Sequence, residues 1–290
     1  MEDTKAKMIS EYKSPKLFIT PTNYKTMKNY FQLLLMLFVT ISSALSQTIS
    51  SKDSIIYACP PCHRDCDTIQ FRKAGICPYC GMKLIAMSIN NFEHKDISIC
   101  FYLQDGIEIL DFAGPLEVFD AAGFKIFIVS KTKEKILSQG LLAIVPEYSI
   151  ADAPKSDITA FFGGETSVPT NDPELISWIQ SGKKSTDYFF SVCTGAFILG
   201  KAGILDNLTA TTYHDLIGAL QEALPKTKVL ANERFVDNAN VITTAGVSAG
   251  IDGALHLVEK LKGRDFAKNV AERIEYDKWV PDRGLIIKNN

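Results

Sequence analysis

The sequence predicts an α/β fold in which a mostly parallel sheet is sandwiched by helices, with a small cysteine-rich module ahead of it. From residue 96 onward, short β-branched and aromatic runs alternate with amphipathic stretches of helical length, the pattern of a parallel sheet flanked by helices. The strand-like runs are nearly continuous in apolar residues, as expected for strands buried on both faces. Five of the seven cysteines lie within residues 57–84, which lack this alternation and therefore form a separate module.

The composition is that of a globular protein with one or two domains. The chain has 290 residues, of which 46% are hydrophobic, and it can bury a sizeable core. Its formal net charge is −2, and it has no long block of Lys or Arg. Nucleic acid is therefore not an expected partner.

The N-terminal extension, residues 1–46, is typical of a targeting sequence. An apolar run at residues 31–41 follows two lysines and precedes small residues that end in an A-L-S site before Gln47. A membrane-spanning helix needs about 20 apolar residues, so this shorter run predicts a cleaved secretory signal, with a buried N-terminal helix as the alternative. We expect an exported protein, periplasmic or extracellular, without a stable membrane span after cleavage. Met27 is an alternative start.

The cysteine-rich module, residues 55–86, has the spacing of a metal site. Cys59 and Cys62 form one C-x-x-C pair. Cys77 and Cys80 form a second pair, and fourteen residues lie between the two pairs. Such spacing brings four thiolates around one ion, an arrangement that zinc favours. We predict these four cysteines as ligands of Zn²⁺ or another soft or borderline metal.

Two alternatives stay open for this module. Disulfides compete with metal binding, because paired cysteines of an exported protein meet an oxidising compartment. His63, Cys66 and Met82 lie within the cluster, and a soft ligand set of this kind also suits Cu(I). The sequence therefore leaves the identity of the metal open.

The second half of the module carries the motif C-P-x-C-G-M-x-L at residues 77–84. In this it resembles short heavy-metal-binding modules. The first half departs from the usual form, because many such modules have C-P-M-H-P and residues 59–63 of this chain read C-P-P-C-H. The additional cysteine, Cys62, favours zinc-ribbon-like ligation.

The elements of the α/β domain, residues 96–288, follow a polar linker at residues 87–95. Short apolar runs predict strands at residues 97–103, 124–130, 158–162 and 188–192. Stretches of helical character predict helices at residues 108–122, 173–182, 196–205 and 247–261. The charged stretch at residues 131–135 is expected to be a solvated loop or hairpin.

The chemistry centres on Cys193, which lies where an apolar strand runs into a small-residue turn and then a helix. Open α/β sheets bind ligands at the carboxyl ends of their strands, and a helix N-terminus stabilises a thiolate. Both effects favour a nucleophile. A buried structural cysteine is the alternative.

Five segments of the α/β domain are together specific, at residues 111–120 (DFAGPLEVFD), 162–164 (FGG), 191–205, 210–212 (ATT) and 244–252 (TAGVSAGID). They resemble the DJ-1/PfpI superfamily, in particular the branch of isonitrile hydratases and the ligand-domain halves of some AraC-type regulators. The resemblance covers about residues 96–280. It implies a flavodoxin-like, doubly wound sheet of the class I glutamine amidotransferase-like type, a homodimer, and no cofactor for this domain.

The resemblance implies roles for four residues. Cys193 would be the nucleophile, with Thr194 as its hydroxyl-bearing neighbour. Asp111 would shuttle a proton, because a carboxylate close to a thiolate has a raised pKa; a helix cap or a solvated loop acid is the alternative. Gly164 would present its backbone N–H to a developing anion, aided by the amide of Thr194; a plain turn is the alternative.

No catalytic triad is expected. Proteolytic PfpI-like relatives have His directly after the Cys, where this chain has Thr194. His214 comes one position later than the His in the A-T-T-H-W of relatives, and His256 reads as a core or surface histidine, so neither is assigned catalysis. Eleven residues follow Trp279, too few for the helix-turn-helix pair that follows in AraC-type regulators.

The expected function is that of a cysteine-dependent hydratase or hydrolase acting on a small molecule, with an isonitrile as one candidate. A non-catalytic sensor, in which Cys193 binds a small molecule or is oxidised, is the first alternative. A metal-handling protein whose α/β domain supports the cysteine module is the second. Because a fold does not fix a function, the substrate is left open.

Overall fold

The computed structural model describes residues 55–62, 64–88 and 96–288. The predicted signal at residues 1–46, His63 and most of the linker at residues 87–95 lie outside the described residues. Within the described part of the chain, no helix combines the length and the hydropathy needed to cross a membrane.

The cysteine-rich module is a small antiparallel sheet with a core of thiols. Its strands pair in the order β2-β1-β3, and the strands are β1 (Ile55–Ala58), β2 (Gln70–Phe71) and β3 (Ile85–Ser88). The 3₁₀-helix η1 (Asp65–Thr68) lies between β1 and β2 in the chain. Cys59, Cys66 and Cys77 are buried together with Leu84, so thiols take the place that aliphatic side chains fill in larger domains.

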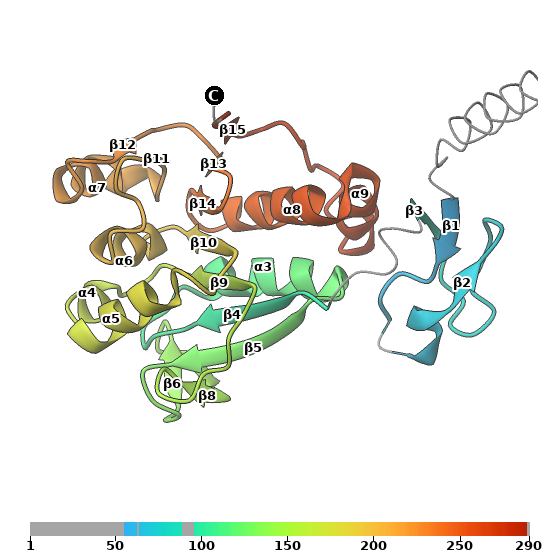
Figure 1. Cartoon of the computed structure of the whole chain (residues 1–290), viewed down its shortest axis with the longest axis horizontal. Coiled ribbons are helices and arrows are strands. Elements are labelled where there is room, and N and C mark those ends of the chain that lie inside the picture. The colour runs from blue at the N-terminus through green and yellow to red at the C-terminus, as the bar shows by residue number, and fades with distance from the viewer. Residues whose placement is uncertain (1–54, 63, 89–95, 289–290) are drawn as a thin grey trace, which may run out of the picture. The chain divides into compact units, whose positions relative to one another are not determined.

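The α/β domain is built on an eight-stranded sheet in the order β15-β13-β14-β10-β9-β4-β5-β8. Its strands are β4 (Ser98–Tyr102), β5 (Lys125–Ser130), β8 (Tyr148–Ser149), β9 (Ile158–Phe161), β10 (Tyr188–Val192), β13 (Phe235–Asp237), β14 (Val241–Thr244) and β15 (Leu285–Ile286). Neighbouring strands are parallel except β13 and β14. The central order β5-β4-β9-β10-β14 is the doubly wound order 2-1-3-4-5 (Figure 1), so the predicted fold class is confirmed.

Helices cover both faces of this sheet. They are α3 (Ile109–Ala121), α4 (Ser167–Thr170), α5 (Pro173–Gly182), α6 (Gly195–Lys201), α7 (Ile217–Ala223), α8 (Ala249–Lys262) and α9 (Arg264–Arg273). Buried side chains of α3, α8 and α9 form one core, and those of α5, α6 and α7 form another. Along β4, Phe101 faces the first core and Cys100 the second, which is why this strand is buried and apolar after Ser98.

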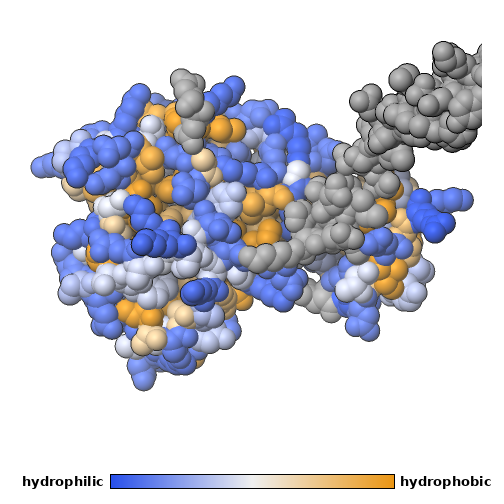
Figure 2. Space-filling model, viewed as in Figure 1, coloured by the Kyte–Doolittle hydropathy of each residue, from blue (hydrophilic) through white to orange (hydrophobic). Residues whose placement is uncertain are grey.

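Short elements complete the domain at its margins. A hairpin joins β6 (Ile136–Ser138) to β7 (Leu142–Ile144), and β11 (Thr209–Ala210) pairs with β12 (Lys228–Val229). The 3₁₀-helix η2 (His214–Leu216) precedes α7. Figure 2 shows a mostly hydrophilic surface on the viewed face, with apolar residues gathered in small areas.

The four predicted strands coincide with β4, β5, β9 and β10 to within one residue at each end. Two helix boundaries differ from the prediction. Helix α6 ends at Lys201 and not at residue 205, because Gly203 adopts a φ of +71° and turns the chain. Helix α8 begins at Ala249 and not at residue 247, because Val247 has a φ of +54°, outside the range of a right-handed helix.

Candidate functional site

Cys193 lies at the turn between the carboxyl end of β10 and the start of α6. Its φ is +57°, a strained conformation for a residue with a Cβ. Three hydrogen bonds hold it there. The Cys193 N–H donates to the carbonyls of Thr244 and Ala245, each at 3.2 Å, and the Thr212 hydroxyl donates to the Cys193 carbonyl at 2.7 Å. The sheet therefore fixes the direction of the thiol, which is 7% exposed.

Asp111 comes from helix α3 and is fully buried. Its Oδ2 accepts the N–H of Gly163 and its Oδ1 accepts the N–H of Val247, both at 2.9 Å. The carboxyl group also lies beside Cys193, because a Cβ on Gly163 would meet both Asp111 Oδ2 and Cys193 Cβ, and the carboxyl and thiol groups shift each other's pKa. One carboxyl group thus connects α3, the loop after β9, the loop after β14 and the thiol.

Burial changes the proton affinity of both partners. It raises the pKa of Asp111 to about 6, although the amides of Val247 and Gly163 act in the opposite direction. Burial, followed by the charge of Asp111, raises the pKa of the Cys193 thiol to about 12. The expected stabilisation of a thiolate by the helix N-terminus is thus outweighed. Near neutral pH the pair holds one proton, on sulfur, beside an ionised carboxylate.

Two consecutive glycines let the partners of Cys193 approach. A Cβ on Gly163 would come within 2.5 Å of Asp111 Oδ2 and 2.7 Å of Cys193 Cβ, so only glycine fits there. Gly164 has a φ of +100°, and its carbonyl accepts the Thr194 hydroxyl at 3.2 Å. Among the residues that the structure describes, the Gly164 N–H has no acceptor, so it is free to bind an anion.

Thr194 lies directly against the nucleophile. Both its backbone N–H and its hydroxyl act on the sulfur of Cys193 in the direction that lowers the pKa of that thiol. The structure therefore brings together the four residues that the sequence predicted for this site: Asp111, Gly164, Cys193 and Thr194.

Tyr213 is a fifth residue of the site, which the sequence did not single out. A Cβ on Gly246 would lie 2.5 Å from Tyr213 Cδ2 and 3.3 Å from Cys193 Sγ, so the ring and the sulfur flank the same glycine. The available signal was the A-T-T-Y segment, in which Tyr213 occupies the position where A-T-T-H-W relatives have His.

Neither histidine that the structure describes is hydrogen-bonded to Cys193. His214 is 72% exposed and pairs with Asp215 at 2.9 Å. His256 is buried, lies 2.8 Å from Asp237 and stacks on Phe235. The site is therefore a cysteine–carboxyl pair, without a histidine from this part of the chain.

The module holds a cluster of thiols. The sulfurs of Cys59, Cys62, Cys66 and Cys80 all lie within 4.8 Å of one another. The sequence predicted Cys77 in place of Cys66. Cys77 is buried and contacts three of these thiols. Thiol donors at this separation suit a soft or borderline metal such as Zn²⁺, and the Met82 amide lowers the pKa of Cys80 to about 6, which favours a thiolate ligand.

Comparison with known proteins assigns these two sites to two different families. Residues 97–260, more than half of the chain, match the DJ-1/PfpI family. This chain belongs to the DJ-1/PfpI family. Residues 56–87 match the family described as heavy metal binding domain, so the thiol cluster and the DJ-1/PfpI domain each lie within a recognised unit.

The DJ-1/PfpI domain is similar to isonitrile hydratase of Pseudomonas putida, with 34% identity over 185 residues that make up 62% of this chain and 78% of that protein. The crystal structure of a ThiJ/PfpI family protein from Pseudomonas syringae is similar at 31% identity and a TM-score of 0.59, covering 64% of this chain and 78% of that one. The HTH-type transcriptional regulator GbdR of Pseudomonas aeruginosa matches at 24% identity over 62% of this chain. The chain spans about half of that regulator's length, 51%.

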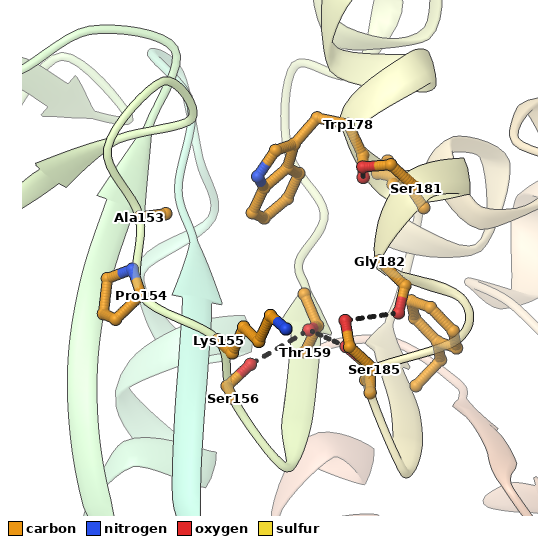
Figure 3. A pocket seen from close by; sticks show the side chains of 12 residues that line it. Ala153, Pro154, Lys155, Ser156, Thr159, Trp178, Ser181, Gly182 and Ser185 are labelled. Carbon is orange, nitrogen blue, oxygen red and sulfur yellow. Dashed lines mark hydrogen bonds between the residues drawn. The ribbon is translucent and has the colours of Figure 1, made fainter.

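The DJ-1/PfpI domain also has a cavity of about 210 Å³ away from Cys193. It lies at the amino ends of β9 and β10, whereas Cys193 follows the carboxyl end of β10. A chain of hydroxyls lines it, with the hydroxyl oxygens of Ser156 and Thr186 each 3.2 Å from that of Thr159 (Figure 3). Because no thiol and no carboxyl group line this cavity, we assign it no reaction.

Proposed function

We propose that the DJ-1/PfpI domain is a cysteine-dependent hydratase or hydrolase for a small electrophilic molecule, and that an isonitrile is the first substrate to test. The observation that carries the proposal is the buried approach of the Asp111 carboxyl group to Cys193 across Gly163. A thiol with a raised pKa needs a base to become a nucleophile, and Asp111 is a base in contact with it.

The proton balance follows from this pair. As Cys193 Sγ bonds to the terminal carbon of the isonitrile, the thiol proton passes to Asp111, and Asp111 delivers it to the same carbon. The resulting thioimidate carries no net charge. Water then attacks that carbon, and one of its protons passes through Asp111 to the imine nitrogen. As the remaining O–H proton passes through Asp111 to the sulfur, the C=O bond forms and the C–S bond breaks. The sum is an isonitrile plus water giving an N-substituted formamide.

Backbone donors support the developing charge in this scheme. The Gly164 N–H has no acceptor in the described structure, and preorganised N–H groups of this kind stabilise oxyanions. The Thr194 N–H already lowers the pKa of the Cys193 thiol and stabilises negative charge as the thiol proton leaves. The similarity to isonitrile hydratase of Pseudomonas putida supports the choice of substrate.

The sensor alternative gains no support from the geometry. Oxidation of a cysteine proceeds through its thiolate, and burial together with Asp111 raises the pKa of Cys193 to about 12. A peroxide sensor needs a lowered thiol pKa, whereas catalysis with a base beside the thiol does not.

The test is turnover of an alkyl isonitrile by the full-length protein, followed by NMR as formation of the formamide. Cys193→Ala should abolish it and Asp111→Asn should lower it by about 10²-fold or more, whereas Cys100→Ala, which removes a buried thiol of β4, should retain it. If wild type and Cys193→Ala hydrate the isonitrile at the same rate, Cys193 is not the nucleophile.

We also propose that residues 1–46 direct export and that the module binds Zn²⁺ or another soft metal. The apolar run at residues 31–41 and its small-residue site support export. Mass spectrometry of the protein recovered from outside the cytoplasm should then give a chain that starts at Gln47. Recovery of a chain with residues 1–46 intact would contradict the signal.

A further inference from the structure

Gln104 places a buried amide beside the glycine pair of the site. It follows strand β4 by two residues and is 5% exposed. Its Nε2 donates to the carbonyls of Phe162 and Gly163, at 3.1 Å and 3.3 Å. Because a backbone carbonyl only accepts hydrogen bonds, the nitrogen of the amide, and not its oxygen, faces the loop after β9.

The oxygen of this amide has no partner. Gln104 Oε1 is buried and accepts no hydrogen bond from the part of the chain that the structure describes. A buried acceptor without a donor lowers stability, whereas an apolar side chain of the same shape can be neutral or stabilising. Packing alone therefore favours an apolar residue at this position, and what the amide adds is its hold on two carbonyls.

One of these carbonyls, that of Gly163, belongs to the peptide that carries the Gly164 N–H. In a trans peptide the carbonyl and the N–H point in opposite directions. Two donors hold the Gly163 carbonyl, Gln104 Nε2 at 3.3 Å and the N–H of Glu108 at 3.1 Å. Holding the carbonyl on one side of the peptide thus fixes the direction of the Gly164 N–H on the other.

The glycine pair borders the reactive thiol. A Cβ on Gly163 would lie 2.7 Å from Cys193 Cβ and 2.8 Å from Thr194 Oγ1. The next carbonyl, that of Gly164, accepts the Thr194 hydroxyl at 3.2 Å. Between these two contacts in the chain lies the Gly164 N–H, which has no acceptor among the described residues. It is therefore the donor that is left for a charge that forms beside Cys193.

A peptide between two glycines needs such an anchor. Glycine adopts the widest range of backbone conformations, so this peptide meets little steric resistance to turning over, which would present a carbonyl oxygen where the N–H now lies. We propose that Gln104 is a positioning residue of the site, because its amide keeps the Gly164 N–H directed at the anion that forms beside Cys193. The inference rests on the function proposed above, in which that N–H stabilises the developing charge.

The first test is hydration of an alkyl isonitrile by full-length Gln104→Met, which keeps the length of the side chain and removes the donor. The kcat should fall by about tenfold, less than the roughly 10²- to 10³-fold lost when an oxyanion donor is deleted outright, and KM should stay near wild type. The rate at which iodoacetamide alkylates Cys193 should not change, because that displacement forms no oxyanion. Gln104→Leu, a second apolar replacement, should give the same losses.

Gln221→Met is the matched control. The Gln221 amide also donates to a backbone carbonyl, that of Thr227 at 2.8 Å, but it lies in helix α7, which contributes no residue to the site. Its removal should leave kcat and KM at their wild-type values.

The second test needs no turnover. Gly163 and Gly164 form the only Gly-Gly pair in the sequence, so in protein labelled with ¹⁵N,1-¹³C-glycine the Gly164 amide is the one glycine nitrogen bonded to a preceding ¹³C carbonyl. Formate should shift the NMR signal of this amide in the wild type, with sodium chloride at equal ionic strength as the control. The titration is made at about pH 5, where Asp111 is mostly protonated because its pKa is about 6. In Gln104→Met the formate concentration for half of the shift should rise by about tenfold, in step with kcat.

The outcomes separate the inference from the proposed function. A wild-type kcat in Gln104→Met, or a fall in kcat with a changed alkylation rate of Cys193, overturns the positioning role while hydration stands. Absence of the formate shift at Gly164 in the wild type overturns it as well, and this measurement does not depend on the folding of a variant. If the wild type does not hydrate the isonitrile but Gln104→Met weakens the formate shift, the proposed function fails and the positioning role stands.

Discussion

The two thiol sites of this protein are assembled in opposite ways. The module draws five thiols from one short segment, and the hydrogen-bonded pair Cys59 and Cys80 is 21 residues apart. The DJ-1/PfpI domain has one reactive thiol, whose partner Asp111 is fixed by amides 52 and 136 residues further along the chain. A local cluster is visible in the spacing of a sequence, whereas a site built from distant segments depends on the whole fold.

The thiol pKa also differs between Cys80 of the module and Cys193 of the DJ-1/PfpI domain. In the module, burial raises the pKa of Cys59, Cys62 and Cys66, whereas the Met82 amide lowers that of Cys80 to about 6. In the DJ-1/PfpI domain, burial and one carboxylate raise the pKa of Cys193 to about 12. Cys80 therefore ionises readily as a metal ligand, whereas Cys193 becomes a nucleophile only when a base removes its proton.

The largest expected effect is a loss of hydration activity without a change in metal binding. Cys193→Ala should lower isonitrile hydration by at least on the order of 10³-fold, because it removes the nucleophile. Sites without shared partners act independently, so Co²⁺ affinity, measured by chelator competition, should be unchanged. A parallel loss of Co²⁺ affinity would show that the two sites are coupled.

The next effect concerns the base. Since Asp111 must be ionised to accept the thiol proton and its pKa is about 6, kcat/KM should fall about tenfold per pH unit below that value and level off above it. Asp111→Asn should lower kcat/KM by about 10²-fold or more and remove this dependence. The measurement is kcat/KM between about pH 4.5 and 8, a range that extends about 1.5 to 2 units to either side of this pKa.

The same variant should raise the rate of a second reaction. The charge of Asp111 raises the pKa of Cys193, so Asp111→Asn should speed alkylation of Cys193 by iodoacetamide while it slows turnover. A variant that merely unfolds the domain would also expose Cys193 to alkylation, so an unchanged urea unfolding midpoint is the control. Slower alkylation in Asp111→Asn would contradict the proposed electrostatics.

A smaller effect tests how tightly the reactive pair is packed. Gly163→Ala should destabilise the domain by about 1–3 kcal/mol, because its Cβ would overlap Asp111 Oδ2 and Cys193 Cβ. Gly218→Ala is the matched control, since nothing lies within 4 Å of a Cβ there and the residue is in helix α7, where alanine is favoured. Urea unfolding measures both, and equal free energies of unfolding would refute the close packing.

The smallest effect concerns the hydroxyl of Thr194. Thr194→Val removes the hydroxyl that donates to the Gly164 carbonyl and that lowers the pKa of the Cys193 thiol, so kcat/KM should fall by about two- to tenfold, the worth of one hydrogen bond. Thr194→Ser keeps the hydroxyl and should stay near wild type. Equal kinetics for the Val and Ser variants would remove this hydroxyl from the mechanism.

The main strands and helices were predictable because their patterns are long and uniform. Strands β4, β5, β9 and β10 are apolar at nearly every position, which leaves little choice of structure. The strands of two or three residues, such as β8 and β15, were not predicted, since so short a run has no period and pairs only because the sheet edge is present.

The sites were predictable to different degrees. Cys193 and Asp111 belong to segments that resemble a family. The pKa values of the two groups depend on burial, however, and a sequence motif does not encode burial. Cys66 was left out of the predicted metal ligands because it belongs to no C-x-x-C pair. The turn η1 brings it to Cys59, and the carboxylate of Asp67, in the same turn, binds the N–H of Cys62. Tyr213 lies beside Gly246, next to the site, through a loop conformation that periodicity does not encode.

The carboxyl group of Asp111 accepts hydrogen bonds from parts of the chain that are synthesised at different times. Domains fold as the chain is made, from the N-terminus onward. Cys193 is synthesised before Val247, whose amide completes the hydrogen bonding of Asp111. A growing chain therefore carries the thiol for more than fifty residues of synthesis without its finished partner. Completion of the domain, and not synthesis of the cysteine, is the event that produces a reactive site.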